Sequence, residues 1–270
     1  EARHNDKIFL LVGDLGYHVV EPFAQEFPER FLNVGIAEQN MAGVAAGLAL
    51  TGYNVYIYSI GNFPTLRCIE QIRNDIAYHN ANVKVVSVGA GYAYGSLGAT
   101  HQATEEIGAM RVMPNMVVAT PGDPVEARAI AKLSAEYDGP MYIRLGKAGE
   151  KVVHIEDNIE LRHGDICPIY VSEGNNTAVL ACGNILDAAY HQIQDKNLPY
   201  DLYSVSFVKP INREQLKFIV EMHPDGIITI EEHQKSCGMG SAIIEIINDL
   251  YAEDELYVYP KLRRIAIPDE

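Results

Sequence analysis

The sequence predicts an α/β fold of two domains, each a mainly parallel sheet flanked by helices. Three observations support this prediction. Short apolar runs alternate with helical patterns, as in βαβ units with right-handed crossovers. A polar, irregular stretch at 146–176 interrupts the alternation once. The length of 270 residues is long for one compact core and comfortable for two. We therefore predict one domain at 1–150 and a second at 151–270.

The predicted strands are short apolar runs rich in Val, Ile and Tyr. Apolar and polar residues do not alternate within them, so both faces of each strand are expected to be covered, as in a parallel sheet between helices. Five runs precede the irregular stretch and three follow it. They are Ile8–Val12, Val55–Ser59, Val83–Val88, Met116–Ala119, Met141–Leu145, Thr177–Ala181, Asp201–Phe207 and Gly226–Ile230.

The predicted helices lie between these strands. The most clearly bounded one starts at Asp123, which caps it ahead of a proline and a glutamate that closes the capping box. It ends near Tyr137, because Asp138-Gly139-Pro140 follows. The others are Ala37–Leu50, Thr65–His79, Gln102–Met113, Leu186–Gln194, Arg213–Met222 and Met239–Tyr251.

Composition disfavours several classes of function. The net charge of −15 repels phosphate backbones, so we expect no nucleic-acid partner. No apolar run approaches the roughly 20 residues of a membrane helix and no signal-like segment opens the sequence, so we expect a cytoplasmic protein without a membrane partner. The four cysteines are scattered, which is typical of reduced thiols, and no Cys/His group has zinc spacing. We therefore expect no metal ligands in this chain.

The most informative segment runs from Phe31 to Leu48 and contains Glu38. Its pattern indicates a short strand, a glycine turn and a helix dominated by Ala and Gly, which can lie close against other backbone. Glu38 falls in the first turn of that helix. From the residues alone, an acid at this position either complements the helix dipole or serves a site.

Motifs along nearly the whole chain resemble the transketolase family, including 1-deoxyxylulose-5-phosphate synthase. The segment Gly35-Ile-Ala-Glu38-Gln39 resembles the family's pyrimidine-binding domain, and Gly98-Ala-Thr-His101-Gln102 resembles its GxTHQ loop. Further resemblances follow in the family's order at Arg111–Met116, Tyr142–Leu145, Phe207–Ile211 and Glu231–Ser241. The resemblance implies a pyrimidine-binding domain followed by a transketolase C-terminal domain.

The resemblance gives Glu38 a catalytic role toward thiamine diphosphate. The matching glutamate of the family hydrogen-bonds N1′ of the coenzyme's aminopyrimidine. A proton placed on N1′ lets the 4′-amino group act, as an imine, on the C2 proton. The coenzyme then supplies the nucleophile and the electron sink.

The resemblance also implies which residues surround the coenzyme. Tyr58 and Phe63 match aromatic positions that line the pyrimidine pocket, and we expect Phe63 to stack on the ring. The segment Ser59–Pro64 differs from the family's usual STF pattern, which leaves the register at Phe63 open by one residue. From the residues alone, both aromatics equally fit a core position beside a strand end. Arg67 matches an arginine near the substrate channel, and the alternative is a solvated helix arginine.

Substrate contacts are expected from further residues. His101 follows the glycine-rich stretch 89–98 and matches a histidine that contacts substrate hydroxyls or a developing oxyanion; the alternative is a structural hydrogen bond. Arg144 would hold a phosphate or another anion through charge-assisted hydrogen bonds. Asp14 and His18 lie just beyond the first strand, at the edge of the sheet where ligands gather in such folds.

One departure from the family concerns Leu97. The family typically has an aspartate here, as in GxDGxTH, which reads the hydroxyls of the donor. An apolar side chain accepts no hydrogen bond, so we expect a modified sugar or another ketose-like donor instead of an ordinary ketose phosphate.

The diphosphate-binding signature of full-length relatives, a GDG followed at a distance by Asn, is not found. Gly13-Asp14-Leu15-Gly16 lacks the second glycine, and Gly164-Asp165-Ile166 fails as well. The resemblance therefore implies a split enzyme. A separate N-terminal diphosphate-binding subunit would hold the diphosphate and Mg²⁺, in an α₂β₂ assembly with the active site at the subunit interface.

The sequence thus predicts a transferase subunit that moves a two-carbon ketol unit from a ketose-like donor to an aldehyde acceptor, both small-molecule sugars. Three alternatives stay open. A beta subunit of a 2-oxo-acid dehydrogenase decarboxylase component shares the domain order and the activating glutamate. A non-catalytic regulatory partner is the second, and the retained Glu38, His101 and Arg144 argue against it. An unrelated nucleotide-binding protein is disfavoured because the sequence has no GxGxxG.

Overall fold

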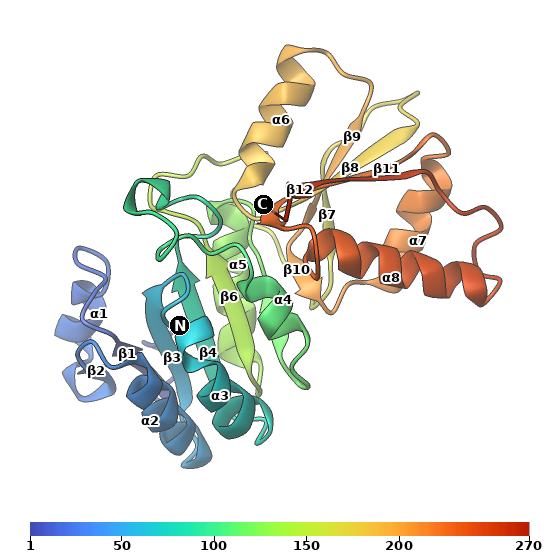
Figure 1. Cartoon of the computed structure of the whole chain (residues 1–270). Helices are drawn as coiled ribbons and strands as arrows, with labels where there is room; N and C mark the ends of the chain where they lie inside the picture. The colour runs from blue at the N-terminus through green and yellow to red at the C-terminus, as the bar shows by residue number, and fades with distance from the viewer. Residues whose placement is uncertain (270) are drawn as a thin grey trace.

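The computed structural model describes residues 1–269 and confirms an α/β fold built on two mainly parallel sheets. The first sheet has seven strands in the order β10-β5-β6-β4-β3-β1-β2, and the second has five in the order β12-β11-β8-β9-β7. Figure 1 shows the first sheet mainly in the blue-to-green half of the chain and the second in the yellow-to-red half. Each sheet has one antiparallel edge pair, β10 with β5 and β7 with β9.

The elements of the first half have the following bounds: β1 (Ile8–Val12), α1 (Glu21–Glu26), β2 (Phe31–Asn33), α2 (Glu38–Leu50), β3 (Asn54–Ile60), α3 (Ile69–Gln71), β4 (Val83–Val88), α4 (Glu106–Arg111), β5 (Val117–Ala119), α5 (Pro124–Glu136) and β6 (Met141–Leu145). The second half continues with β7 (Ile166–Tyr170), β8 (Thr177–Cys182), α6 (Ile185–Asp195), β9 (Asp201–Val205), β10 (Phe207–Lys209), α7 (Arg213–Met222), β11 (Gly226–Gln234), α8 (Met239–Ala252) and β12 (Leu262–Ile267). Short 3-10 turns lie at η1 (Pro28–Arg30), η2 (Leu66–Cys68) and η4 (Gly95–Leu97), and a π-helical segment at η3 (Ile72–Ala77).

The prediction of one strand over Asp201–Phe207 is wrong. The chain leaves the second sheet at the end of β9, and β10 then pairs with β5 in the first sheet. The backbone N–H of Thr120 donates to the carbonyl of Ser206, 2.7 Å away, at the crossing point. A continuous buried apolar run looks the same whether its strands share a sheet or not, so the sequence pattern could not show the break.

The two sheets also share one core. The largest cluster of buried apolar side chains extends from α2 and β3 in the first half to α7 and α8 in the second. The connection between β6 and β7 contains the predicted boundary at residue 150, which stays a prediction. Since β10 and this cluster join the two halves of the chain, we expect the two halves to unfold together.

Two predicted helices differ from the structure in extent. The predicted helix Gln102–Met113 shortens to α4, because its first residues form the loop that ends the glycine-rich stretch. The predicted helix Thr65–His79 is divided into η2, α3 and η3. No helix among residues 1–269 is long and apolar enough to span a bilayer.

Candidate functional site

The start of α2 places Glu38 at the carboxyl edge of the first sheet. The chain turns at Gly35, which has φ of +74°, and α2 begins at Glu38. The buried face of α2 is made of Ala and Met, so the helix lies close against the sheet. The Glu38 side chain is 2% exposed and packs over Gly13, where an added Cβ would sit 3.4 Å from its Cγ. A buried carboxylate therefore ends beside the first strand.

Three further predicted residues join Glu38 in one connected group. The Nη1 of Arg67 in η2 donates to Oε2 of Glu38 over 2.8 Å. The Arg67 guanidinium lies 4.3 Å from the centre of the Phe63 ring, a cation–π distance. The Phe63 ring in turn meets the His101 ring edge-on, with centroids 5.2 Å apart. The Arg67 side chain is 44% exposed, so the group opens to solvent at that residue.

Two asparagines that the sequence analysis did not single out hold the loops of this group. The amide of Asn62 donates to the carbonyl of Gln102 over 2.6 Å and so joins the loop after β3 to the histidine loop. The amide oxygen of Asn33 accepts from the backbone N–H groups of Asp14 and Gly35. Their only sequence signal is an asparagine at a strand end, which is common in ordinary turns.

Asp14 and His18 occupy the exposed loop after β1. Asp14 has φ of +56°, and its carboxylate accepts from the amide of Asn33 over 3.1 Å. His18 also has a positive φ, and its backbone N–H donates to the carboxylate of Glu21. Both residues lie at the predicted sheet edge. Their proposed contacts with substrate stay predictions.

Tyr58 lies apart from the Glu38 group. Consecutive residues of a strand point to opposite faces, and Ile57 packs into the core beside α2. Tyr58 therefore faces the other side of the sheet, where it lines a cavity of about 580 Å³ with Gly16 and Tyr94. Burial raises the pKa of its hydroxyl. No hydrogen bond between Tyr58 and Glu38 is found among residues 1–269, and Phe63 is the predicted aromatic that lies in the Glu38 group.

Arg144 lies in a buried network, and its predicted role in binding a substrate anion stays a prediction. Its side chain is 1% exposed, and Nε lies 2.5 Å from Oε1 of Glu106 in a buried ion pair. Its Nη2 donates to the carbonyls of Ala103 and Glu232. Burial alone would raise the pKa of Glu106, but the charge and hydrogen bond of Arg144 leave it lowered. Arg144 thus joins the two halves of the chain, while its Nη1 has no hydrogen-bond partner within residues 1–269.

Leu97 ends the turn η4 in the loop after β4, and its side chain is 54% exposed. The loop folds tightly, because Gly89 has φ of +95° and an added Cβ would collide with the Tyr94 ring. The loop then reaches His101 through Gly98, which also has a positive φ. The apolar side chain is therefore presented at the surface near the histidine that closes the group.

The arrangement supports proton placement more directly than any other chemistry. Oε2 of Glu38 is held by Arg67, while no hydrogen bond of Oε1 is found among residues 1–269. A buried carboxylate with a free oxygen can accept a hydrogen bond from a ring nitrogen or place a proton on it. An aromatic ring and a histidine lie along the same edge. These are the groups that a flat heteroaromatic cofactor and a hydroxylated substrate would meet.

Two family models match the chain: the transketolase pyrimidine binding domain over residues 1–149 and the transketolase C-terminal domain over residues 169–270. A putative transketolase C-terminal section from Methanocaldococcus jannaschii is 36% identical, over 99% of this chain and 83% of that protein. A subunit of an apulose-4-phosphate transketolase from Phocaeicola vulgatus is 33% identical, over 100% of this chain and 84% of that protein.

Longer enzymes and a solved structure are similar as well. A 1-deoxy-D-xylulose-5-phosphate synthase from Clostridium perfringens is 29% identical over 94% of this chain, which spans 41% of that enzyme. A solved structure described as a split gene transketolase, inactive beta4 tetramer, has a TM-score of 0.84 and 35% identity. That similarity covers 99% of this chain and 85% of the solved one.

Proposed function

Because this chain belongs to the transketolase family, as its motifs predicted and two family models confirm, we propose that it is one subunit of a thiamine-diphosphate-dependent transketolase. The proposed reaction moves a two-carbon ketol unit from a ketose-like donor to an aldehyde acceptor. The observation that carries the proposal is the buried carboxylate of Glu38 at the start of α2, held by Arg67 at the edge of the sheet.

The residues present fit the pyrimidine end of the coenzyme. The coenzyme, when bound, supplies the carbon nucleophile and the electron sink for ketol transfer. Glu38 would face the ring nitrogen N1′ and hold a proton there, which is the role of a positioned general acid. Burial of the side chain keeps water away from that hydrogen bond and so favours a fixed position.

Phe63 and Arg67 would set where the ring lies. The Arg67 guanidinium covers the Phe63 ring at 4.3 Å, so an aromatic ring stacked on that face must displace it. The Arg67 side chain is 44% exposed and makes a single ion pair, which permits such a movement. His101, edge-on to Phe63, would then contact the substrate's hydroxyls.

A separate subunit is proposed to bind the diphosphate and Mg²⁺. The relatives named as a C-terminal section, a transketolase subunit and a split gene product have lengths similar to this chain. One of them is described as an inactive tetramer of beta chains. These descriptions support an assembly in which this chain provides the pyrimidine site and a partner completes the active site, with α₂β₂ as the proposed composition.

The proposed donor is a modified ketose phosphate or a related ketose-like compound. Leu97, exposed in the loop that leads to His101, offers no acceptor for a donor hydroxyl. One relative that covers the whole chain is named for apulose-4-phosphate. Both observations favour a donor that differs from an ordinary ketose phosphate in its hydroxyl pattern.

The test uses the complex of this chain with its copurified partner, assayed with thiamine diphosphate and Mg²⁺ against branched and unbranched ketose phosphates and 2-oxo acids. We expect ketol transfer, and Glu38→Gln should lower kcat by about 100- to 10,000-fold, as removal of a general acid–base group does. The matched control is Glu214→Gln, which removes an exposed acid from the first turn of α7. That variant should keep full activity.

Three outcomes decide between this proposal and its rivals. Decarboxylation of a 2-oxo acid without ketol transfer would favour a dehydrogenase component. Unchanged activity in Glu38→Gln would favour a non-catalytic partner. Equal losses of activity in Glu38→Gln and Glu214→Gln would show that Glu38 only complements the dipole of its helix, as Glu214 does.

A further inference from the structure

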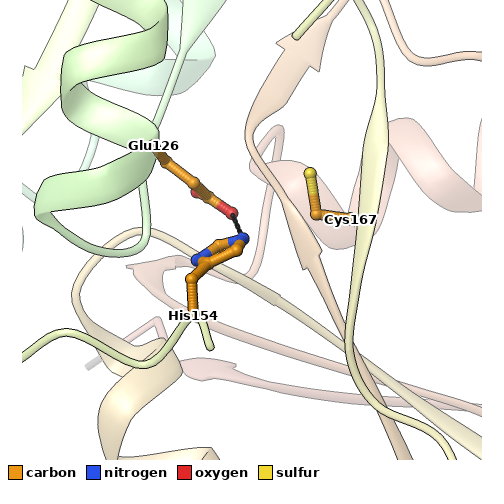
Figure 2. A group of neighbouring side chains, drawn as sticks. All are labelled: Glu126, His154 and Cys167. Atoms are coloured by element: carbon orange, nitrogen blue, oxygen red, sulfur yellow. Dashed lines mark ion pairs between the residues drawn. The ribbon is translucent and has the colours of Figure 1, made fainter. Parts of the chain in front are cut away.

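A second group of polar side chains lies where the two halves of the chain meet, away from the Glu38 group. It contains Glu126 of α5, His154 of the connection between β6 and β7, and Cys167 of β7. One ligand atom from each residue lies within 4.8 Å of the other two. Figure 2 shows the Glu126 carboxylate meeting the His154 ring, with Cys167 on the neighbouring strand. The three residues are far apart in sequence, which is why cysteine and histidine spacing did not reveal the group.

Two facing atoms of this group are buried and lack hydrogen bonds within residues 1–269. They are Oε1 of Glu126, whose side chain is 0% exposed, and Nε2 of His154, whose side chain is 8% exposed. Their separation of 3.6 Å is too long for a hydrogen bond. Buried polar atoms that face each other without a bond usually have a missing partner. A small species between them would satisfy both atoms.

Neighbouring residues orient these two atoms. The ring Nδ1 of His154 donates to Oδ2 of Asp123 over 3.0 Å, so Nε2 of the neutral ring carries a lone pair. The same oxygen of Asp123 also accepts from the backbone N–H groups of Val153 and His154, each over 3.0 Å. Oε2 of Glu126 accepts from the backbone N–H of Gly122 over 2.6 Å. A carboxylate that fixes a histidine in this way is common behind metal-bound imidazoles.

The same geometry suits a metal ion. Ligand atoms about 2.0–2.2 Å from a tetrahedral zinc ion lie roughly 3.3 Å apart, close to the 3.6 Å found here. The Cys167 sulfur lies within 4.8 Å of the other two atoms and needs a shift of about 1 Å to reach bonding distance. A thiolate and a carboxylate would together neutralise a divalent cation, which removes the penalty of an isolated buried charge.

We propose that Glu126, His154 and Cys167 form a binding site for one divalent transition-metal ion of the zinc class. The mixed oxygen, nitrogen and sulfur ligands favour such a cation over Mg²⁺ or Ca²⁺. A cavity of about 310 Å³, lined by His154 and Cys167, leaves room for water at a fourth position. Because the ligands come from both halves of the chain and from their connection, the ion would pin the two halves together. This site is independent of the proposed transketolase activity.

Metal binding at this site must release a proton. A cysteine binds a metal ion as the thiolate, so the sulfur must lose its thiol proton. The cation takes the place of that proton, which leaves for solvent, and the affinity therefore rises with pH. The alternative is a protonated His154 ring that donates to both Asp123 and Glu126, and this arrangement would need no metal.

The test titrates Co²⁺, as a spectroscopic substitute for Zn²⁺, into the metal-free chain. We expect one equivalent to bind, with a thiolate-to-cobalt charge-transfer band, and Zn²⁺ to displace it. Cys167→Ser should abolish the band, and Glu126→Gln should weaken binding at least tenfold. The matched control is Cys237→Ser, which changes the exposed free cysteine and should leave band and stoichiometry unchanged.

Two results would overturn the proposal: no stoichiometric band in the wild-type chain, or the same band in Cys167→Ser. If Cys167→Ser does not fold, alkylation of the wild-type chain tests the metal site instead. Zn²⁺ should protect Cys167 from N-ethylmaleimide by at least tenfold in rate, while Cys237 reacts equally with and without the metal. Equal modification of Cys167 in both conditions would contradict the site.

Discussion

Replacement of Glu106 by Gln tests whether Arg144 is a structural residue. The Arg144 guanidinium is 1% exposed, and Glu106 is the partner that balances its charge. Glutamine keeps the shape of the side chain but leaves the cation among backbone carbonyls alone. Breaking a buried ion pair in this way costs about 3–5 kcal/mol of the free energy of unfolding. With a urea m-value of about 3 kcal/mol/M, the midpoint should fall by about 1–1.7 M.

The assay is urea unfolding of the chain followed by far-ultraviolet circular dichroism, because the sequence contains no Trp. The control is Glu26→Gln, which breaks the exposed pair with Arg3 and should leave the midpoint unchanged. The double variant Glu106→Gln/Arg144→Met should recover part of the loss, since it removes both charges. An unchanged midpoint in Glu106→Gln, together with a raised KM of the complex, would refute the structural role and restore Arg144 as an anion-binding residue.

Two further predictions concern titration and close packing. Burial lowers the pKa of Lys84 to about 7, whereas in the unfolded chain it is 10.5, so above pH 7 only the unfolded chain keeps the proton. The free energy of unfolding of the wild-type chain should therefore rise by about 1 kcal/mol more than that of Lys84→Met between pH 7 and pH 8. Equal pH dependence of the two proteins would exclude the lowered pKa of Lys84. Gly91→Ala should destabilise the chain more than Gly35→Ala. Both glycines have positive φ, but only at Gly91 does an added Cβ meet another residue, 2.6 Å from the Cβ of Glu232. Thermal unfolding of both variants measures this difference, and an equal fall in melting temperature would contradict the prediction.

The local parts of the candidate site could be predicted from the sequence. Glu38 was expected in the first turn of its helix, and α2 begins at that residue. Phe63, Arg67 and His101 were expected near it because their motifs match one family, and the structure brings all three together. Each motif sets its own turn or helix start locally, whereas the contacts between the motifs join distant segments and form only when the sheet and loops pack.

The tertiary structure decided which partners the remaining residues meet. A buried arginine and an exposed one look alike in the sequence, so only the tertiary structure showed that Arg144 is buried and that its Nε pairs with Glu106. The strand prediction placed Tyr58 beside a strand end, but the alternation of side chains turned it to the opposite face from α2. The burial of Arg144 and the face on which Tyr58 lies are not recorded in the apolar pattern from which the elements were predicted.

Periodicity and motifs in the sequence by themselves determined the α/β class, most strand and helix positions and the family, because these depend on order along the chain. Only the three-dimensional structure decided the crossing of β10 into the first sheet and the meeting of Glu126, His154 and Cys167. The physical reason is the same for both. Contacts between segments distant in sequence depend on how the elements pack, and a pattern of apolar and polar residues records which face is buried but not what lies against it.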